Sequence, residues 1–318
     1  MNTPTFSIVT PSYNQGQFIE ETIKSVLSQE GNFYIDYIVM DGGSTDNSVE
    51  IIKKYEQLLK EGKWPINCRG IQYRWASEED RGQSDAINKG FEMAKGSIFA
   101  WLNSDDTYMP GAVSKAVDYF NSNFDVGMVY GKAYYIDEAN NIIGKYPTEP
   151  FDYKRLADFT FVTQSSTFFK KEIYFAAGGL NPDLHYSMDY DLWIRIANIS
   201  RIEYLPAFLS TYRLQKESKT VSYIHALKFQ EEQLRTVFKH YKWAPPNRIY
   251  GYCYHLVRNK TPDFLLKYKI LITALALMGS LITYIRLNKK IKLKDIKMIN
   301  RANINKLFKD WTDIYLEY

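Results

Sequence analysis

The sequence predicts an α/β protein, in which a mostly parallel sheet is flanked by helices and followed by a helical C-terminal extension. Over roughly the first hundred residues, short apolar runs alternate with amphipathic segments of helical period, and the connections between them are short. The apolar run at 97–102 ends in two adjacent carboxylates, as a buried strand with a loop at its carboxyl end would. Nearer the C-terminus, a long uncharged run lies between basic residues.

Hydrophobic periodicity locates the individual elements. Strands are expected at residues 6–10, 34–40, 71–75 and 97–102, and helices at 18–29, 48–59 and 85–94. Further along, we expect a hairpin of residues 126–136 and 140–146, a strand at 161–169, a helix from Met188 onward, and a helix at 221–241. The sequence therefore predicts two domains, an α/β domain of residues 1–220 and a helical region of residues 221–318.

The basic residues are concentrated in the tail. The 318-residue chain has 40 Lys+Arg and 36 Asp+Glu, a formal net charge of +4. Residues 264–318 hold 11 of the basic and 4 of the acidic residues, a net charge of +7, so the rest of the chain has a net charge of −3. This distribution indicates an anionic surface as the partner of the tail. No aromatic platform interleaves with the basic residues, which argues against a nucleic-acid partner.

Cysteine usage and the start of the chain indicate the compartment. Cys68 and Cys253 are the only cysteines, so neither a disulfide framework nor a thiolate metal site is available. The chain opens on a predicted strand, without a basic segment followed by an apolar one. We therefore expect a protein of the reducing cytosol.

Polar and aromatic side chains follow three of the predicted strands. Pro11 and Tyr13 come after the first strand, Asp41 after the second, and Asp105 and Asp106 after the fourth. A ring can pack on a nucleobase, a carboxylate can accept a hydrogen bond from a base or a ribose, and paired carboxylates favour a cation such as Mg²⁺ or Mn²⁺ shared with a phosphate. The simpler interpretation is a set of ordinary turns and helix caps.

Two common nucleotide-binding motifs are missing from the first loop. A dinucleotide site would have Gly-x-Gly-x-x-Gly there, and a P-loop would have Gly-Lys-Ser/Thr. Residues 11–16 read Pro-Ser-Tyr-Asn-Gln-Gly instead. A nucleotide at this edge would therefore be held in another way.

Three motifs, in this order and spacing, resemble the family-2 glycosyltransferases of the GT-A fold. They are Ser-Ile-Val-Thr-Pro-Ser-Tyr-Asn at 7–14, Ile-Val-Met-Asp-Gly-Gly-Ser-Thr-Asp at 38–46 and Asn-Ser-Asp-Asp at 103–106. The similarity runs from residue 6 to residue 220, two thirds of the chain.

The resemblance assigns roles to these loops. It implies that Pro11, Tyr13 and Asp41 grip the nucleotide of a sugar donor. Asp105 would contact the ribose or assist the metal, and Asp106 would ligate the Mn²⁺ or Mg²⁺ that bridges the donor diphosphate. Asn103 stands where many relatives carry a further Asp.

A fourth run, Gly-Gln-Ser-Asp-Ala-Ile-Asn-Lys-Gly at 82–90, is similar to one that lines the donor pocket in many relatives. The resemblance makes Asp85, together with Arg81, a candidate for contact with the sugar and phosphates. A capped surface helix with Asp85 in its first turn explains the same residues equally well.

On the acceptor side, the resemblance makes Asp189 the catalytic base that takes the proton of the acceptor hydroxyl. Met188 replaces the usual preceding Glu, and Gln215 replaces a His of the relatives. Without the family, an Asp at the start of a helix is more simply a partner of the helix dipole. The Gln-x-x-Arg-Trp run of processive synthases is absent, which implies transfer of one sugar per encounter.

The resemblance thus implies a metal-dependent, inverting hexosyl- or N-acetylhexosaminyl-transferase. It would move a sugar from a nucleotide-diphosphate donor, with UDP as the expected nucleotide, to a hydroxyl of a saccharide or lipid-linked acceptor in surface polysaccharide biosynthesis. Two alternatives stay open. One is a sugar nucleotidyltransferase, although its usual Gly-rich loop is missing. The other is a non-catalytic membrane-associated assembly protein with a degenerate donor site, which the departures at Asn103, Met188 and Gln215 would suit.

The uncharged run at 270–285 has 16 residues and basic flanks on both sides. Spanning a bilayer takes about 20 apolar residues, and a spanning helix usually has an asymmetric charge distribution. We therefore expect a buried or interfacial helix, with the following basic segment up to Lys309 on anionic headgroups. The expected location is cytoplasmic, peripheral on the inner face of the cell membrane.

Overall fold

The computed structural model describes residues 3–215, 223–290 and 295. By their contacts, the chain separates into two compact units, one of residues 1–151 and 161–213 and the other of residues 152–160 and 214–318. The segment 152–160 therefore packs with the helical unit, although it lies within residues 1–220, which we predicted to form one domain. The basic segment between 291 and Lys309 lies outside the described residues, apart from residue 295.

The first unit is built on a sheet with the strand order β3-β2-β1-β4-β8-β6-β9-β5, and β7 pairs with β6. The strands are β1 (Thr5–Ser12), β2 (Tyr34–Asp41), β3 (Gly70–Ser77), β4 (Ile98–Trp101), β5 (Thr107–Tyr108), β6 (Val126–Ile136), β7 (Ile142–Lys145), β8 (Thr167–Lys170) and β9 (Arg201–Arg213). The first four are parallel, as predicted, and the remainder of the sheet is mixed.

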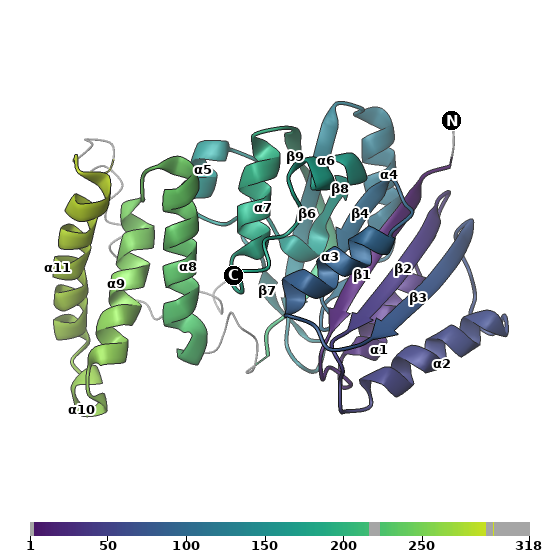
Figure 1. The fold of residues 1–318 in the computed structure, drawn as a ribbon, viewed down its shortest axis with the longest axis horizontal. Helices are drawn as coiled ribbons and strands as arrows, with labels where there is room; N and C mark the ends of the chain where they lie inside the picture. The colour runs from purple at the N-terminus through teal and green to yellow at the C-terminus, as the bar shows by residue number, and fades with distance from the viewer. Residues whose placement is uncertain (1–2, 216–222, 291–294, 296–318) are drawn as a thin grey trace. The chain divides into compact units, whose positions relative to one another are not determined.

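Helices cover both faces of this sheet (Figure 1). They are α1 (Ile19–Leu27), α2 (Ser48–Lys60), α3 (Gln83–Met93), α4 (Ala112–Ser122), α6 (Lys171–Ala176) and α7 (Met188–Ala197). Alternate residues of the central strands point to opposite faces, and both faces are apolar, which is typical of a sheet buried on both sides. The predicted α/β class is therefore confirmed.

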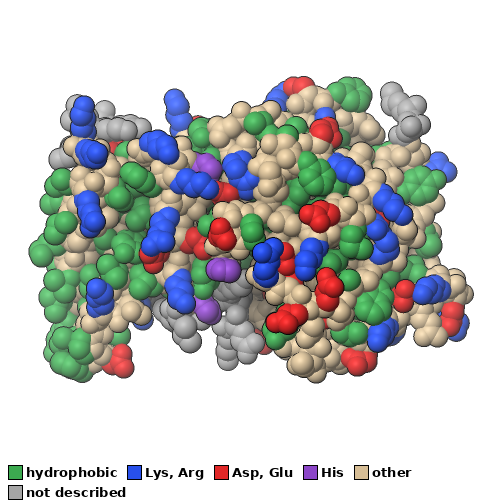
Figure 2. Space-filling model, in the orientation of Figure 1, with side chains coloured by type: hydrophobic (Ala, Val, Ile, Leu, Met, Phe, Trp, Pro, Cys, Tyr) green, Lys and Arg blue, Asp and Glu red, His purple; other side chains and the backbone are tan. Residues whose placement is uncertain are grey.

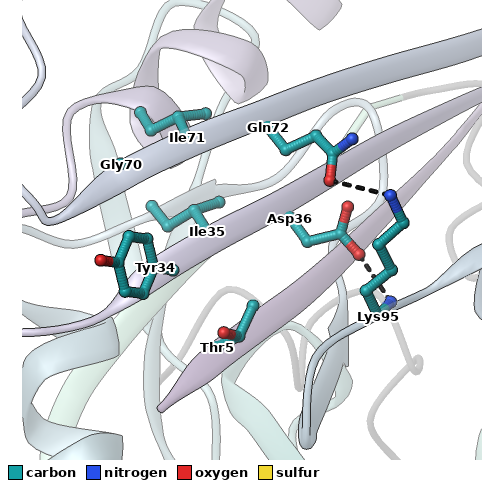
Figure 3. Close-up of a pocket in the computed structure, with 8 residues that line it drawn as sticks. All are labelled: Thr5, Tyr34, Ile35, Asp36, Gly70, Ile71, Gln72 and Lys95. Carbon is teal, nitrogen blue, oxygen red and sulfur yellow. Dashed lines mark hydrogen bonds between the residues drawn. The ribbon is translucent and has the colours of Figure 1, made fainter. Parts of the chain in front are cut away.

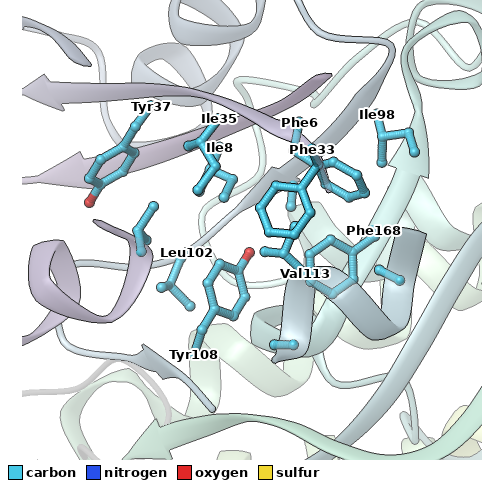
Figure 4. Packing of buried hydrophobic residues seen from close by; sticks show 14 of the residues in the cluster. Phe6, Ile8, Phe33, Ile35, Tyr37, Ile98, Leu102, Tyr108, Val113 and Phe168 are labelled. Atoms are coloured by element: carbon cyan, nitrogen blue, oxygen red, sulfur yellow. The ribbon is translucent and has the colours of Figure 1, made fainter. Parts of the chain in front are cut away.

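One face of the sheet packs against α1, α2 and α4. This face is lined by Phe6 and Ile8 of β1, by Ile98 of β4 and by Leu102 directly after it, and side chains such as Val113 contribute from the helices (Figure 4). Each of these side chains is nearly or fully removed from water, which is worth about 1.5–3 kcal/mol per large apolar side chain.

The opposite face is an aromatic layer under α3, α6 and α7. Phe91 of α3 stacks on Phe99 of β4 with ring centroids 4.5 Å apart. Trp193 of α7 stacks on Trp101 with centroids 5.3 Å apart. Because β4 supplies Phe99 and Trp101 to this layer and leads directly into the Asp105–Asp106 loop, the packing fixes the position of that loop.

The predicted strand at 161–169 is wrong over its first half. Gln164–Ser166 form a short 3₁₀ turn, and β8 covers only Thr167–Lys170. The hydroxyl of Ser166 donates to the carbonyl of Gly131 at 3.1 Å, and that of Thr167 donates to the carbonyl of Thr163 at 2.6 Å. Such side-chain to backbone bonds compete with the strand ladder.

The second unit is helical. It contains α5 (Tyr153–Asp158), α8 (Tyr223–Tyr241), α9 (Pro246–Lys260), α10 (Asp263–Leu266) and α11 (Lys269–Asn288). Leu234, Ala244, Ile249, Cys253 and Tyr284 form its buried cluster. The helix expected at 221–241 is confirmed from residue 223 onward, and residues 221 and 222 lie outside the described residues.

Candidate active site at the carboxyl edge of the sheet

The topology brings the predicted loops to one edge of the sheet. From β1 the chain proceeds outward to β2 and β3, and then returns to place β4 on the other side of β1. This reversal between β1 and β4 is a topological switch point, outside which ligands bind in open α/β sheets. Tyr13 follows β1 and the Asp105–Asp106 pair follows β4, so both lie beside this point.

The loops after β1 and β2 are joined by hydrogen bonds. The backbone N–H of Asn14 donates to Ser44 Oγ at 2.8 Å, and the N–H of Thr45 donates to Asn14 Oδ1 at 2.8 Å. Asn14 adopts a left-handed conformation with φ 50°, which lets it make both bonds. Tyr13 beside it is 61% exposed, whereas Pro11 is buried within β1.

Gly42 lies against this exposed ring and leaves room for the carboxylate of Asp80. A Cβ atom at Gly42 would lie 2.7 Å from Asp80 Oδ2 and 3.5 Å from Tyr13 Cδ2. A side chain at this position would therefore force Asp80 aside. The ring of Tyr13, the backbone of Gly42 and the carboxylate of Asp80 form one small surface, and the sequence analysis missed Asp80.

The Asp41 carboxylate is 2% exposed and holds the second loop in place. It accepts hydrogen bonds from Ser44 Oγ at 2.5 Å, Ser44 N at 2.9 Å, Gly43 N at 3.1 Å and Ser77 Oγ at 2.7 Å. Three of these donors bond Oδ2 and one bonds Oδ1, so most of the acceptor capacity of this carboxylate is used within the protein. In this arrangement Asp41 orders the loop beside Tyr13 instead of facing outward.

Asp85, in the first turn of α3, is neutralised by two cations. Arg81 Nη2 lies 3.1 Å from Oδ1, and Lys89 Nζ lies 3.2 Å from Oδ2. Burial alone would raise the pKa of Asp85, but the hydrogen bonds from Arg81 and Lys89 outweigh it and lower the pKa. The Arg81 side chain is 79% exposed, so Asp85 anchors a guanidinium that reaches solvent.

Asp105 and Asp106 differ in exposure. Asp106 is 1% exposed, and its Oδ1 accepts the backbone N–H of Arg213 at 3.0 Å. Asp105 is partly exposed. Burial raises the pKa of Asp106 well above its usual range, and the charge of Asp105 adds to the effect. A cation beside the pair would favour the ionised form of both.

Asn103 connects this pair to the loop before α3. Its Oδ1 accepts a hydrogen bond from Gln83 Nε2 at 2.7 Å, while its Nδ2 lies 3.5 Å from Asp106 Oδ2. An Asp here could not donate to Asp106. The Asn103 amide therefore contacts both Gln83 and Asp106, whereas a carboxylate at this position could not donate to Asp106.

The guanidinium of Arg213, at the end of β9, lies beneath the Asp105–Asp106 loop. Its side chain has no exposed surface and donates to the carbonyl of Asp105 at 2.9 Å and to Glu21 Oε2 at 2.7 Å. The guanidinium also lies 4.6 Å from the ring of Phe18. Because the sequence analysis placed this region only by resemblance, it missed that Arg213 supports the carboxylate loop from inside the protein.

Asp189 lies in the first turn of α7 and is partly exposed. The preceding Met188 is buried, and its sulfur accepts a hydrogen bond from Ser84 Oγ at 2.8 Å. Asn88 of α3 adds a second connection, because it donates to the carbonyl of Leu180 at 2.8 Å and accepts from its N–H at 3.0 Å. The segment that carries Asp189 is thus attached to α3. Gln215 is buried and belongs to the second unit.

A pocket of about 410 Å³ lies at the opposite ends of the strands (Figure 3). Thr5, Tyr34, Asp36, Gln72 and Lys95 are among the residues that line it. Asp36 accepts hydrogen bonds from the N–H of Lys95 at 2.8 Å and from Ser7 Oγ at 2.7 Å. Since Tyr34 opens β2 and Asp41 closes it, this pocket is separate from the candidate site.

The carboxylate pair fits a divalent ion that is held largely by other ligands. Within the described ranges, no group of three or more His, Cys, Asp and Glu side chains is arranged to bind a metal. Carboxylate oxygens are the ligands that Mg²⁺ and Mn²⁺ prefer, and such ions commonly keep water and substrate phosphate in their coordination shell. Asp105 and Asp106 would then supply only part of that shell.

The chain is similar in sequence to glycosyltransferases. The chain is 28% identical over 279 residues to an uncharacterized glycosyltransferase of Methanocaldococcus jannaschii, covering 84% of this chain and 93% of that protein. It is 21% identical to the chondroitin synthase of Escherichia coli over 76% of this chain and 34% of that protein. The chain therefore spans about a third of the synthase.

Solved structures share the fold. TarS of Staphylococcus aureus, in complex with UDP-GlcNAc, has a TM-score of 0.59 at 16% identity, covering 86% of this chain and 79% of that one. A mannosyltransferase of Pyrobaculum calidifontis, in complex with GDP-Man and Mn²⁺, has a TM-score of 0.56 at 16% identity, covering 99% and 86%. These similarities show that the first unit has the GT-A fold.

The family model named glycosyl transferase family 2 matches residues 7–180. This range contains the loops after β1, β2 and β4, the run before α3 and the Asp105–Asp106 pair. Because it covers more than half of the chain, the protein belongs to glycosyl transferase family 2.

Proposed function

We propose that this glycosyltransferase uses a divalent metal to transfer one sugar, with inversion, from a nucleotide-diphosphate donor to a hydroxyl group. The observations that carry the proposal are three sets of hydrogen bonds at this edge of the sheet. They join the loop after β1 to the loop after β2, the loop after β4 to α3, and α3 to Met188 directly before Asp189. UDP is the expected nucleotide. The acceptor is a saccharide or lipid-linked oligosaccharide of a surface polysaccharide.

Tyr13 is the residue that would contact the nucleobase. Its ring is exposed at the carboxyl edge of the sheet, and a ring in that position can stack on any base. Pro11 and Asp41 would support the position of this ring without facing solvent themselves. Pro11 is buried within β1, and Asp41 orders the loop at Gly42 and Gly43. TarS, which shares the fold, binds UDP-GlcNAc.

The diphosphate would lie between Arg81 and the carboxylate pair. Arg81 is held by Asp85 and reaches solvent, so it can approach a phosphate. Asp105 is the more accessible carboxylate, and buried Asp106 would complete the pair from below. Mn²⁺ or Mg²⁺ bound to this pair would neutralise charge on the departing diphosphate. The mannosyltransferase that shares the fold binds GDP-Man and Mn²⁺.

Asp189 would act as the base. Its position at the start of α7 leaves the carboxylate partly exposed, while Met188 and Ser84 keep the helix start in place. A sugar hydroxyl becomes a good nucleophile only when its proton is taken in the transition state. Attack from the face opposite the leaving diphosphate gives inversion at the anomeric carbon.

The location that suits this reaction is the cytoplasmic face of the cell membrane. We infer peripheral attachment from the basic, apolar C-terminal unit and from a lipid-linked acceptor. No nucleic acid is expected as a partner.

Product analysis tests the proposed reaction. The full-length protein is incubated with single UDP-sugars and GDP-sugars, with Mn²⁺, Mg²⁺ or EDTA, and the released nucleotide is identified. Release of a nucleoside diphosphate that requires the metal supports sugar transfer. Formation of pyrophosphate from a sugar phosphate and a nucleoside triphosphate would instead support a nucleotidyltransferase. Failure to bind any nucleotide sugar in the presence of Mn²⁺ would support a non-catalytic protein.

A further inference from the structure

Helix α11 presents a long apolar face to solvent. No charged residue occurs between positions 270 and 285, and Ile270, Met278 and Ile282 are 81%, 62% and 66% exposed. Leu277, Leu281 and Ile285 extend the same surface. Figure 2 shows hydrophobic side chains gathered over this helix, at the left edge of the view. A contiguous apolar patch of this kind marks an interaction surface.

The opposite side of α11 is packed within its own unit. Ile272, Ala276 and Tyr284 are buried, and Tyr284 shares a cluster with Ile249 and Cys253 of α9. The end of the helix is also fastened, because Asn288 exchanges two hydrogen bonds of 2.8 Å with the backbone N–H and carbonyl of Ala244. One apolar side of the helix is therefore buried against its own unit, and the other apolar side faces solvent.

This packing argues against a transmembrane orientation. By length and composition, α11 is the one helix among the described residues that could cross a membrane. Helix α9, which packs along it, contains buried Arg248 and His255 and partly exposed Arg258. Inserting α11 across a bilayer would carry these polar side chains into hydrocarbon, where charged groups are costly.

The charges around the patch indicate what covers it. Residues 258–290 contain seven basic side chains and one acidic side chain, Asp263. Lys267 and Lys269 precede the apolar run, and Arg286 and Lys289 follow it. Two copies of this surface, placed face to face in either direction, would bring like charges together. An anionic lipid surface complements both ends at once, because each basic residue near the headgroups is attracted to them.

We propose that α11 lies parallel to an anionic bilayer, with the face of Ile270, Met278 and Ile282 in the acyl boundary and the basic residues of both ends on the headgroups. Interfacial helices typically bury their apolar face about 5–10 Å into this region. The inference extends the proposed membrane location and is independent of the transfer reaction.

Vesicle flotation of the full-length protein tests this orientation without any sugar substrate. The protein is expected to float with vesicles of phosphatidylcholine and phosphatidylglycerol, and at least tenfold less with phosphatidylcholine alone or at high salt. Met278→Glu/Ile282→Glu should lower flotation at least tenfold. Ile142→Glu, at an exposed apolar position of β7, is the matched control and should float like the wild type.

Three results would overturn the proposal. The proposal requires the double glutamate variant to float less than the wild type, so equal flotation with an unchanged circular dichroism spectrum contradicts it. Retention in the membrane after alkaline carbonate extraction would indicate a spanning helix. A wild-type dimer that does not float, and that the double glutamate variant converts to a monomer, would make a second copy the occupant.

Discussion

The backbone N–H of Arg213 donates a 3.0 Å hydrogen bond to Oδ1 of Asp106, although the two residues are 107 positions apart. The guanidinium of the same residue donates to the carbonyl of Asp105 at 2.9 Å. One residue at the end of β9 thus holds the Asp106 carboxylate through its backbone N–H and the backbone carbonyl of Asp105 through its guanidinium. The position of the proposed metal ligands depends on a strand that lies far from them in the sequence.

Arg213→Lys should lower turnover by about a hundredfold, because a small displacement of the carboxylate loop misplaces the reacting groups. Lysine cannot reproduce a guanidinium that donates to the Asp105 carbonyl and to Glu21 at once. The unfolding free energy should fall by about 2 kcal/mol, since buried acceptors lose their donors. Arg201→Lys, at an exposed ion pair with Asp125, is the control. Wild-type activity of Arg213→Lys would show that the loop does not need this support.

Replacing each acid of the Asp105–Asp106 pair by alanine should separate its role in metal-dependent turnover from its role in the stability of the fold. Both Asp105→Ala and Asp106→Ala should abolish Mn²⁺-dependent turnover. Asp106→Ala should also lower the unfolding free energy by about 1–3 kcal/mol, because it leaves the N–H of Arg213 buried without its acceptor. Urea unfolding and a turnover assay measure the two effects. Asp118→Ala, at an exposed position of α4, should change neither. Full activity of either site variant would remove that residue from the metal site.

Tyr13→Ala should weaken UDP binding by about tenfold, which lies within the 1–3 kcal/mol that a base–aromatic stack contributes. Tyr13→Phe should bind like the wild type, because only the ring is needed. Tyr34→Ala removes a 45% exposed ring at the other end of the strands and serves as the control. Isothermal titration calorimetry with UDP and Mn²⁺ provides the measurement. Equal affinities of the Tyr13→Ala and Tyr34→Ala variants would place the base elsewhere.

An ion pair between α1 and α2 should make stability depend on pH. Glu20 lies 2.8 Å from Lys54 Nζ and 2.8 Å from the Tyr55 hydroxyl, and these hydrogen bonds lower its pKa from 4.5 to about 2. A lowered folded-state pKa stabilises the protein above the unfolded pKa, and this contribution is lost as the pH falls from 4.5 toward 2.

Glu20→Gln should therefore lower the unfolding free energy at pH 7 by about 1 kcal/mol or less, since the pair is partly exposed. The difference from the wild type should shrink between pH 4.5 and pH 3. Urea unfolding at these pH values measures the difference, with Glu50→Gln, at an exposed position of α2, as the control. A difference that stays constant with pH would exclude the ion pair as its source.

The alternating first half of the fold could be predicted from the sequence because its signals are local. Apolar runs such as 97–102 and the helical periods between them are set within a few residues, so the parallel order of β1 to β4 follows from short connections. The short strand β5 was not predicted, because Thr107 and Tyr108 form a strand only by pairing with Ser210 and Thr211 of β9. Strand β9 was not predicted either. Pairing over such a distance has no local signature.

The residue types at the candidate site could be predicted, but their orientation could not. Adjacent acids such as Asp105 and Asp106 are equivalent in a sequence pattern, and the position of Arg213 decides which of them is buried. Similarly, nothing near Asp41 indicates that four protein donors occupy its carboxylate, because one of them is Ser77 of β3. Met188 looked like a loss of function in the sequence, whereas in the structure it is a buried contact of Ser84.

Asp189→Asn should lower turnover by about a hundredfold or more while leaving UDP binding unchanged, because a base acts on the acceptor and does not contact the nucleotide. The amide keeps the size and much of the hydrogen bonding of the carboxylate, including acceptance from the N–H of Tyr190 at 2.7 Å, so α7 should stay folded. Asp183→Asn, an exposed acid in the preceding segment, controls for the loss of charge. Calorimetry with UDP and a turnover assay separate the two steps. Weakened nucleotide binding at unchanged turnover would mean that Asp189 belongs to the donor side, and the base would have to be sought among other residues.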